Sequence, residues 1–252
     1  GFIQSTFTNN YGSTWDSVLL NQDQTNLSRY PSATIFNPSG NTATSGLFSV
    51  VSGPFTQGTT GWFGNYYAWG QLNNTNVSVK TDLNSAIPLQ QHFTRINMQS
   101  TDTKVIVTGA LMADANGTTA VAQKFRGAAI NYGTFASNNF TWVVDSIIPL
   151  MKLDPSDGQK QNYTSANTAW SKDGQTGYVI FTGIDSAATG TQLAYQPVVY
   201  KTTNGGTAWT KMPSGNYSTL PAIAPTLIAS NGGSYKAFYS KASGYGTCVD
   251  AN

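Results

Sequence analysis

Glutamate is missing from this 252-residue chain, and charged residues of every kind are scarce. Only 10% of the residues are charged, against about 25% in typical globular proteins. The net charge is +2, and the lysines and arginines occur singly, so the sequence lacks the basic stripe that binds nucleic acid. Its surface must be polar mainly through Thr, Ser, Asn, Gln and Gly. Such a surface suits an extracellular protein that makes hydrogen bonds.

Cysteine, histidine and long apolar runs are also scarce. Cys248 is the single cysteine, so it forms no internal disulfide; it is either a buried thiol or pairs with a segment outside this chain. His92 is the single histidine, and one His with one Cys is too few for a zinc site. We therefore expect no metal and no cofactor. Apolar runs such as Val105 to Val107 are far shorter than the ~20 residues of a membrane span, so none is expected.

What the sequence does contain is a strand-and-turn pattern along its whole length. Short runs rich in β-branched and aromatic residues are each bounded by Gly, Pro, Asn or Asp, and helical periodicity never lasts a full helix. The clearest runs are residues 32–36, 47–51, 104–108, 178–181 and 197–200. No linker interrupts them. The pattern predicts an all-β protein, with residues 1–252 forming a single domain or a fragment of one.

A turn followed by tryptophan recurs at a regular spacing. Residues 8–15 and 202–209 are the two clear copies, and residues 138–142 are a degraded one. Trp142 and Trp209 are 67 residues apart, and Trp15 and Trp142 are 127 apart, or about two steps of 64. A middle copy then falls near Val79, in a strand pattern without tryptophan. This period predicts a β-propeller of four-stranded antiparallel blades, with repeats ending near Trp15, Val79, Trp142 and Trp209.

About four blades of this size nearly exhaust the chain. Closed propellers usually have between four and eight blades. Either the ring closes with a few large blades, or the polypeptide continues beyond Asn252. The second alternative is favoured, so the chain is expected to belong to a larger polypeptide or assembly.

The residues of the repeated turn have structural roles. Asn10 and Asn204 are expected to bond to amides of their own turns, and Gly12 and Gly206 to adopt positive φ. The tryptophans that follow are expected at equivalent buried positions between neighbouring sheets. The residues assigned to this motif are Thr8, Asn10, Gly12, Trp15, Trp142, Thr202, Asn204, Gly206 and Trp209.

These turns resemble the Asp-box, or BNR, repeat of sialidase-like propellers, Ser/Thr-x-Asp-x-Gly-x-Thr-Trp, with asparagine in the Asp position. The chain also resembles the propeller part of large secreted Bacteroidetes proteins that the type IX secretion system exports. The segments that carry this second resemblance are residues 29–42, 51–54, 126–133 and 169–178. It implies a location outside the cell or on its outer surface, with a cell-surface protein or a glycan as partner.

Sialidase resemblance also implies a set of catalytic residues, which this chain meets poorly. The family has an arginine triad, a Tyr–Glu nucleophile pair and an Asp acid/base. The only arginines here are Arg29, Arg95 and Arg126, and no glutamate exists to activate a tyrosine. We therefore expect no catalytic residues and a non-catalytic scaffold or recognition module. The alternative is a sialidase-like glycoside hydrolase, which requires the three arginines to converge with two carboxylates.

An aromatic cluster is the candidate binding surface. It comprises Trp62, Tyr66, Tyr67 and Trp69. Two interpretations stay open: core packing between blades, which is favoured, or an exposed platform that stacks against sugars or contacts a protein.

Three Asp-Ser-apolar triplets are candidate modification sites. They resemble the O-glycosylation sequon of Bacteroidetes and would place glycans on Ser17, Ser146 and Ser186. The alternative is that Asp and Ser simply mark strand ends after a tryptophan.

Overall fold

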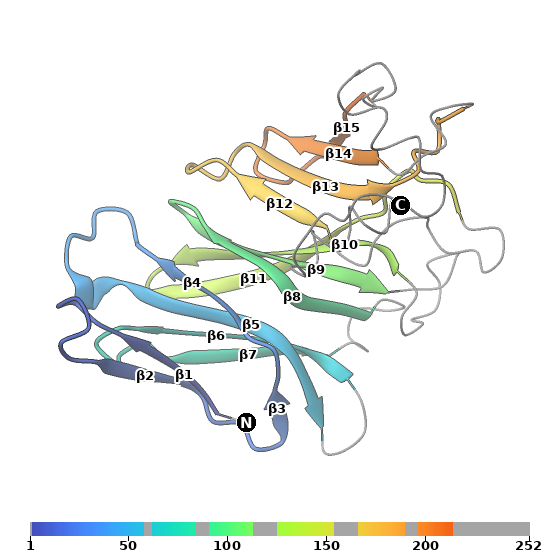
Figure 1. Cartoon of the computed structure of the whole chain (residues 1–252). Coiled ribbons are helices and arrows are strands. Elements are labelled where there is room, and N and C mark those ends of the chain that lie inside the picture. Colours follow the sequence, from blue (N-terminus) through green and yellow to red (C-terminus); the bar gives the residue numbers. More distant parts are fainter. Residues whose placement is uncertain are drawn as a thin grey trace.

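The computed structural model describes residues 2–57, 62–83, 91–112, 125–153, 166–189 and 196–213 (Figure 1). In these ranges the protein consists of β-strands joined by turns, with a single 3-10 turn, η1, at Thr44–Gly46. The predicted all-β class is confirmed. No helix in these ranges is long and apolar enough to cross a membrane.

The strands form four antiparallel sheets, numbered here in chain order. Sheet 1 contains β1 (Ile3–Phe7) and β2 (Asp16–Asn21). Sheet 2 contains β3 (Asn26–Ser28), β4 (Ser32–Phe36), β5 (Phe48–Gln57), β6 (Trp62–Gln71) and β7 (Ser78–Leu83). Sheet 3 contains β8 (Gln91–Ser100), β9 (Lys104–Met112), β10 (Phe125–Ala136) and β11 (Asn139–Ile147). Sheet 4 contains β12 (Asn167–Trp170), β13 (Gly177–Gly183), β14 (Gln196–Thr202) and β15 (Thr210–Lys211).

Each of sheets 2 to 4 is a meander, in which strand order in space follows strand order in the chain. Sheet 2 has one addition, because β3 and β4 share the same edge of β5. Strand β4 pairs with Phe48 to Ser52, and β3 pairs with Phe55 to Gln57. Sheets 3 and 4 have four strands each. Short connections between successive strands of this kind favour antiparallel neighbours.

The predicted repeat positions all fall at the last strand of a sheet. Trp15 directly precedes β2, Val79 lies in β7, Trp142 lies in β11, and Trp209 directly precedes β15. The spacing read from the sequence therefore coincides with the last strands of the four sheets. The turn at residues 8–15 lies between the two strands of sheet 1, and the turn at residues 202–209 lies between the third and fourth strands of sheet 4; we call these two turns the first and second box turns.

The sheets stack face to face, and strands β4, β8 and β12 of sheets 2, 3 and 4 follow one another across the stack (Figure 1). Strand β4 contacts β8, and β8 contacts β12. Alternation along each strand sends successive side chains to opposite faces. In β9, for example, Val105 and Val107 pack toward sheet 2, whereas Ile106 packs toward sheet 4.

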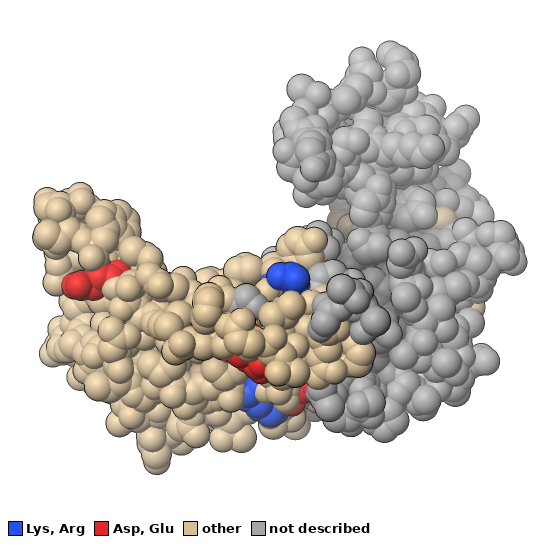
Figure 2. All heavy atoms as spheres, turned by 90° about the horizontal axis from the view of Figure 1, so that it is seen from below, with Lys and Arg blue, Asp and Glu red and all other residues tan. Residues whose placement is uncertain are grey.

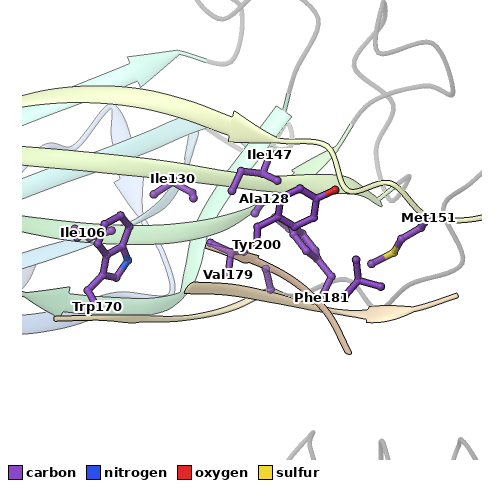
Figure 3. Packing of buried hydrophobic residues seen from close by; sticks show 12 residues of the cluster. Ile106, Ala128, Ile130, Ile147, Met151, Trp170, Val179, Phe181 and Tyr200 are labelled. Atoms are coloured by element: carbon purple, nitrogen blue, oxygen red, sulfur yellow. The ribbon is translucent and has the colours of Figure 1, made fainter. Parts of the chain in front are cut away.

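Three hydrophobic clusters fill the three spaces between sheets. Cluster A, between sheets 1 and 2, includes Val18, Leu20 and Tyr66. Cluster B, between sheets 2 and 3, is mainly aromatic and includes Tyr67 and Trp142. Cluster C, between sheets 3 and 4, is shown in Figure 3; its labelled members are Ile106, Ala128, Ile130, Ile147, Met151, Trp170, Val179, Phe181 and Tyr200. Sheets 2 and 3 are thus buried on both faces, which explains their continuous apolar runs.

Candidate functional site

The two clear copies of the turn have the same hydrogen bonds. In the first, the Asn10 side-chain oxygen accepts from the Thr14 N–H at 2.9 Å, and the Thr8 hydroxyl oxygen accepts from the Gly12 N–H at 3.0 Å. In the second, the Asn204 oxygen accepts from the Ala208 N–H at 2.9 Å, and the Thr202 hydroxyl oxygen accepts from the Gly206 N–H at 3.1 Å.

Each threonine also donates its own hydroxyl proton to the asparagine two residues later. The distance is 2.9 Å from Thr8 to Asn10 and 2.8 Å from Thr202 to Asn204. The predicted bonding of both asparagines to their own turns is confirmed. The polar side chains of this motif are therefore used within the turn itself.

Positive backbone φ angles close both turns. Gly12 has φ +87° and Gly206 has φ +95°, as predicted. At Gly206 a Cβ atom would also lie 2.2 Å from the Tyr132 hydroxyl oxygen, so the position excludes side chains for a second reason. The residue before each glycine has positive φ as well. It is Gly205 in the second turn, but Tyr11, with φ 57°, in the first.

The degraded third copy is not a box turn, which corrects the prediction. Strands β10 and β11 pair up to Ala136 and Asn139, leaving a tight hairpin turn at Ser137 and Asn138. Both turn residues have positive φ, 50° and 60°. Trp142 therefore lies inside β11, whereas Trp15 and Trp209 directly precede their strands. What the three share is only that each lies at the last strand of a sheet.

The three tryptophans are not equally buried, so the expectation of equivalent buried positions is wrong. Trp142 is 5% exposed and stacks on Tyr67, with ring centroids 4.3 Å apart. Trp209 is partly buried and meets Trp170 edge-on at 5.5 Å. Trp15 is 62% exposed. Sheet 1, as described, has no strand in the place that β12 and its Trp170 occupy in sheet 4, and so nothing equivalent covers Trp15.

Three of the four residues of the candidate binding surface lie in the core, so the less favoured interpretation, an exposed platform, is wrong for them. Tyr66 and Tyr67 are fully buried and Trp69 is 4% exposed. Alternation on β6 divides them, with Tyr66 in cluster A and the other two in cluster B. The Trp62 side chain lies outside the described residues. The favoured alternative, packing between neighbouring sheets, is the one confirmed.

Hydrogen bonding anchors the buried tyrosine between two sheets. The Tyr67 hydroxyl donates to the Asn131 side-chain oxygen at 2.6 Å, and the Asn131 amide donates to the Val107 carbonyl at 3.1 Å. Burial raises the Tyr67 pKa well above its ordinary value, and the charge of Asp82 adds to the effect. This tyrosine is a neutral structural donor at physiological pH.

Lys104 joins the second box turn to the preceding sheet, a role that the sequence did not indicate. Its ammonium group donates to the Gly205 carbonyl at 2.8 Å. It also lies 5.3 Å from the ring centroid of Tyr132 and 5.5 Å from that of Trp170. Desolvation lowers the pKa of Lys104. A lone lysine after a short turn carries no signal of these long-range contacts.

Two of the three arginines have described side chains. Arg29 is exposed after β3, and Arg126 is 7% exposed in β10. The side chains of Arg95 and His92 fall outside the described set, and so does the convergence of the three arginines that the glycoside hydrolase alternative requires. Cys248 is likewise outside the described ranges. Across those ranges, no three His, Cys, Asp or Glu side chains gather to hold a metal ion.

The three candidate glycosylation serines lie in different settings. Ser17 and Ser146 are partly exposed within β2 and β11, whereas Ser186 is exposed in a turn after β13. The aspartate before Ser186 has a structural role: Asp185 is 1% exposed and pairs with Lys211 at 2.5 Å. Modification at these serines remains a prediction.

No family model matches this chain, and no curated protein matches it either.

Proposed function

We propose that this chain is part of an Asp-box-type β-propeller that serves as a non-catalytic scaffold or recognition module in a secreted or cell-surface protein. The observation that carries the proposal is that the described aromatic and polar side chains of the candidate sites pack in the core or bond within their own turns. The aromatic residues Tyr66, Tyr67 and Trp69 fill the spaces between sheets. The threonine and asparagine of each box turn bond to each other and to their own backbone.

The remaining surface supports the same proposal. Figure 2 shows one face, on which the described part has charged side chains at only a few places. Such a surface would meet a partner through neutral hydrogen-bonding groups, as in a contact with a glycan or with another polar protein surface. Rigid sheets that present polar turns are a common basis for recognition, because loops contact the partner while the scaffold positions them.

A pair of measurements tests this proposal. The intact protein is assayed against fluorogenic sialosides and against neutral glycosides, and its binding is measured on a glycan array and to intact cell surfaces. We expect no turnover. Binding to a glycan or to a cell-surface protein supports recognition, and its absence supports a scaffold role. Turnover that is lost in an Arg126→Lys variant with unchanged thermal stability would instead establish the glycosidase alternative.

The propeller part of the proposal has its own test. Cryo-electron microscopy of the natively sourced polypeptide shows whether the sheets surround a common axis. We expect sheets 2, 3 and 4 to be consecutive blades, with β4, β8 and β12 nearest the axis, because β4 contacts β8 and β8 contacts β12. A flat or helical stack of the same sheets would contradict it.

A further inference from the structure

The first box turn bears two exposed aromatic side chains. Tyr11 is fully exposed, and Trp15, the last residue before β2, is mostly exposed. The turn lies at the end of sheet 1 where β1 passes into β2 (Figure 1). Neither ring belongs to the three hydrophobic clusters of the described residues. The two rings thus contribute little to the core between the sheets.

Comparison with the second box turn shows that the first does not need an aromatic residue at position 11. The equivalent residue is Gly205, with φ 71°, and the two turns have the same hydrogen bonds. Tyr11 has φ 57°, a left-handed conformation that is unfavourable for a residue with a side chain and rare for a bulky one. Strained residues of this kind gather at functional sites. The tyrosine therefore points to a ligand.

The Trp15 ring rests on the turn itself. A Cβ atom at Gly12 would lie 3.8 Å from Cζ2 and 3.9 Å from Nε1 of the indole, so the ring lies against the backbone at this glycine. Among the described residues, sheet 1 has no counterpart of Trp170, which meets Trp209 edge-on in sheet 4. A rigid ring that is supported on one side and open on the other offers a large contact area at a small cost in conformational entropy.

The surroundings of the two rings are polar and lack positive charge. Residues 1–28, which include all of sheet 1, contain two aspartates and neither lysine nor arginine. The Asn74 amide donates to the Ser17 carbonyl at 3.0 Å, so the turn between β6 and β7 lies beside the start of β2. Asn73, Asn74 and Asn76 are all exposed in that turn. Amide groups donate and accept hydrogen bonds, as the hydroxyl groups of a neutral ligand do.

We propose that Tyr11 and Trp15 form a stacking site for a neutral saccharide. The indole ring stacks on the apolar CH face of a pyranose ring, and the asparagine amides beside β2 bond to its hydroxyl groups. The proposal rests on the recognition role proposed above and names its ligand class. A protein partner fits this site less well, because a stable protein interface buries roughly 1,200 Å² or more around an apolar centre. The exposed aromatic surface at this turn is confined to two rings.

Isothermal titration calorimetry of the full chain tests the site. The neutral probes are cellohexaose, xylohexaose, mannohexaose and chitohexaose, and sialyllactose is the acidic comparison. We expect saturable binding of at least one neutral probe and none of sialyllactose, because sheet 1 has no cation to pair with a carboxylate. Binding of none of the neutral probes, or of sialyllactose alone, would overturn the proposal and leave the scaffold role standing.

Two substitutions separate binding from stability. Trp15→Ala should raise the Kd of the bound saccharide about tenfold and leave the melting temperature nearly unchanged, because the ring is mostly exposed. Tyr11→Gly gives the first turn the residue that the second has at Gly205. It should weaken binding, yet keep the melting temperature or raise it by about 1–3 °C, because the strain of the positive φ is relieved. A tyrosine with a purely structural role would give the opposite result, a lower melting temperature with unchanged binding.

Tyr30→Ala is the matched control. Tyr30 is also an exposed tyrosine with positive φ, 42°. It lies close to Ser28, which accepts a hydrogen bond from Asn21 at the opposite end of β2 from Trp15. This variant should bind like the parent. Parent-like binding by Trp15→Ala, or an equal loss in Tyr30→Ala, would overturn this site but not recognition elsewhere on the molecule. Only turnover in the glycoside assays would overturn the non-catalytic role itself.

Discussion

At the scale of single residues, the burial of each tryptophan depends on which side chains pack against it. Tyr67 of sheet 2 stacks on Trp142, and Trp170 of sheet 4 packs edge-on against Trp209 in the same sheet. Trp15 follows a turn with the same hydrogen bonds as the second box turn, yet it is 62% exposed. The turn motif is local and can be read from eight residues. Burial is not local, and this is why the sequence could not predict it.

Trp142→Ala should be the most costly of the tryptophan substitutions. The ring is 5% exposed and is surrounded by Tyr67, Trp69 and Phe140, so its removal leaves a cavity in cluster B. We expect a loss of about 3–5 kcal/mol in the free energy of unfolding. Trp209→Ala, at a partly buried site, should lose roughly 2 kcal/mol.

Urea denaturation of the purified variants measures both losses. Val143→Ala is the matched control, because it lies next to Trp142 on β11 and is 60% exposed. It should cost less than about 1 kcal/mol. If Trp142→Ala cost no more than this control, the aromatic cluster would not stabilise the contact between sheets 2 and 3.

At the scale of elements, the sequence predicted the strands and the two box turns well, because their signals are local. The threonine, asparagine and glycine of each turn indicated its hydrogen bonds and its positive φ angles. The degraded copy failed for a physical reason. Ser137 and Asn138 form a tight hairpin turn with two positive φ angles, and this turn is too short for the hydrogen bonds between residues four apart that define the box turns. A tryptophan without the threonine, asparagine and glycine before it did not indicate a box turn.

Asn204→Ala should destabilise sheet 4. The side-chain oxygen accepts hydrogen bonds from the Thr202 hydroxyl and the Ala208 N–H, and both would be lost. We expect about 1–2 kcal/mol, measured by thermal or urea denaturation. Asn204→Asp keeps both acceptors and should match the parent or exceed its stability, because a carboxylate accepts these bonds more strongly. Equal losses in the two variants would show that the amide NH2 group is what matters.

Gly206→Ala separates steric exclusion from backbone strain. Both Gly206 and Gly40 have positive φ, +95° and +80°. A Cβ at Gly206 would lie 2.2 Å from the Tyr132 hydroxyl oxygen, whereas one at Gly40 has nothing within 4 Å. Gly40→Ala should therefore cost only the strain of about 1–2 kcal/mol, and Gly206→Ala should cost clearly more. Differential scanning calorimetry compares them, and similar losses would mean that the turn moves away from Tyr132 freely.

At the scale of the whole molecule, the hydrophobic core of the described residues lies between neighbouring sheets. Sheets 2 and 3 are buried on both faces, and cluster B joins them through aromatic rings from β4, β5, β6 and β11. The four repeat ends read from the sequence lie in, or directly before, the last strand of a sheet. The sequence did not predict the contacts of charged side chains between sheets, such as that of Lys104 with the second box turn. The residues around a lysine do not indicate a partner about 100 positions away in the chain.

The buried tyrosines make the stability of this stack sensitive to alkaline pH. Burial raises the pKa of Tyr66, and that of Tyr67, above the ordinary value of 10.0. In the unfolded chain each hydroxyl loses its proton near pH 10.0, while in the folded protein it keeps it. The unfolded state then binds fewer protons, so the stability that is fully present below this pH falls as the pH rises above it.

The expected slope is up to about 1.4 kcal/mol per pH unit for each such tyrosine. Urea denaturation at about pH 8, pH 10 and pH 11 measures it. Tyr67→Phe removes one of these hydroxyl groups and leaves the Asn131 oxygen without its donor, so this variant should be less stable at about pH 8. Its free energy of unfolding should nevertheless fall less steeply above pH 10.0 than that of the parent. Parallel curves for parent and variant would mean that the Tyr67 hydroxyl ionises in the folded protein as readily as in the unfolded chain, and that water reaches the space between sheets 2 and 3.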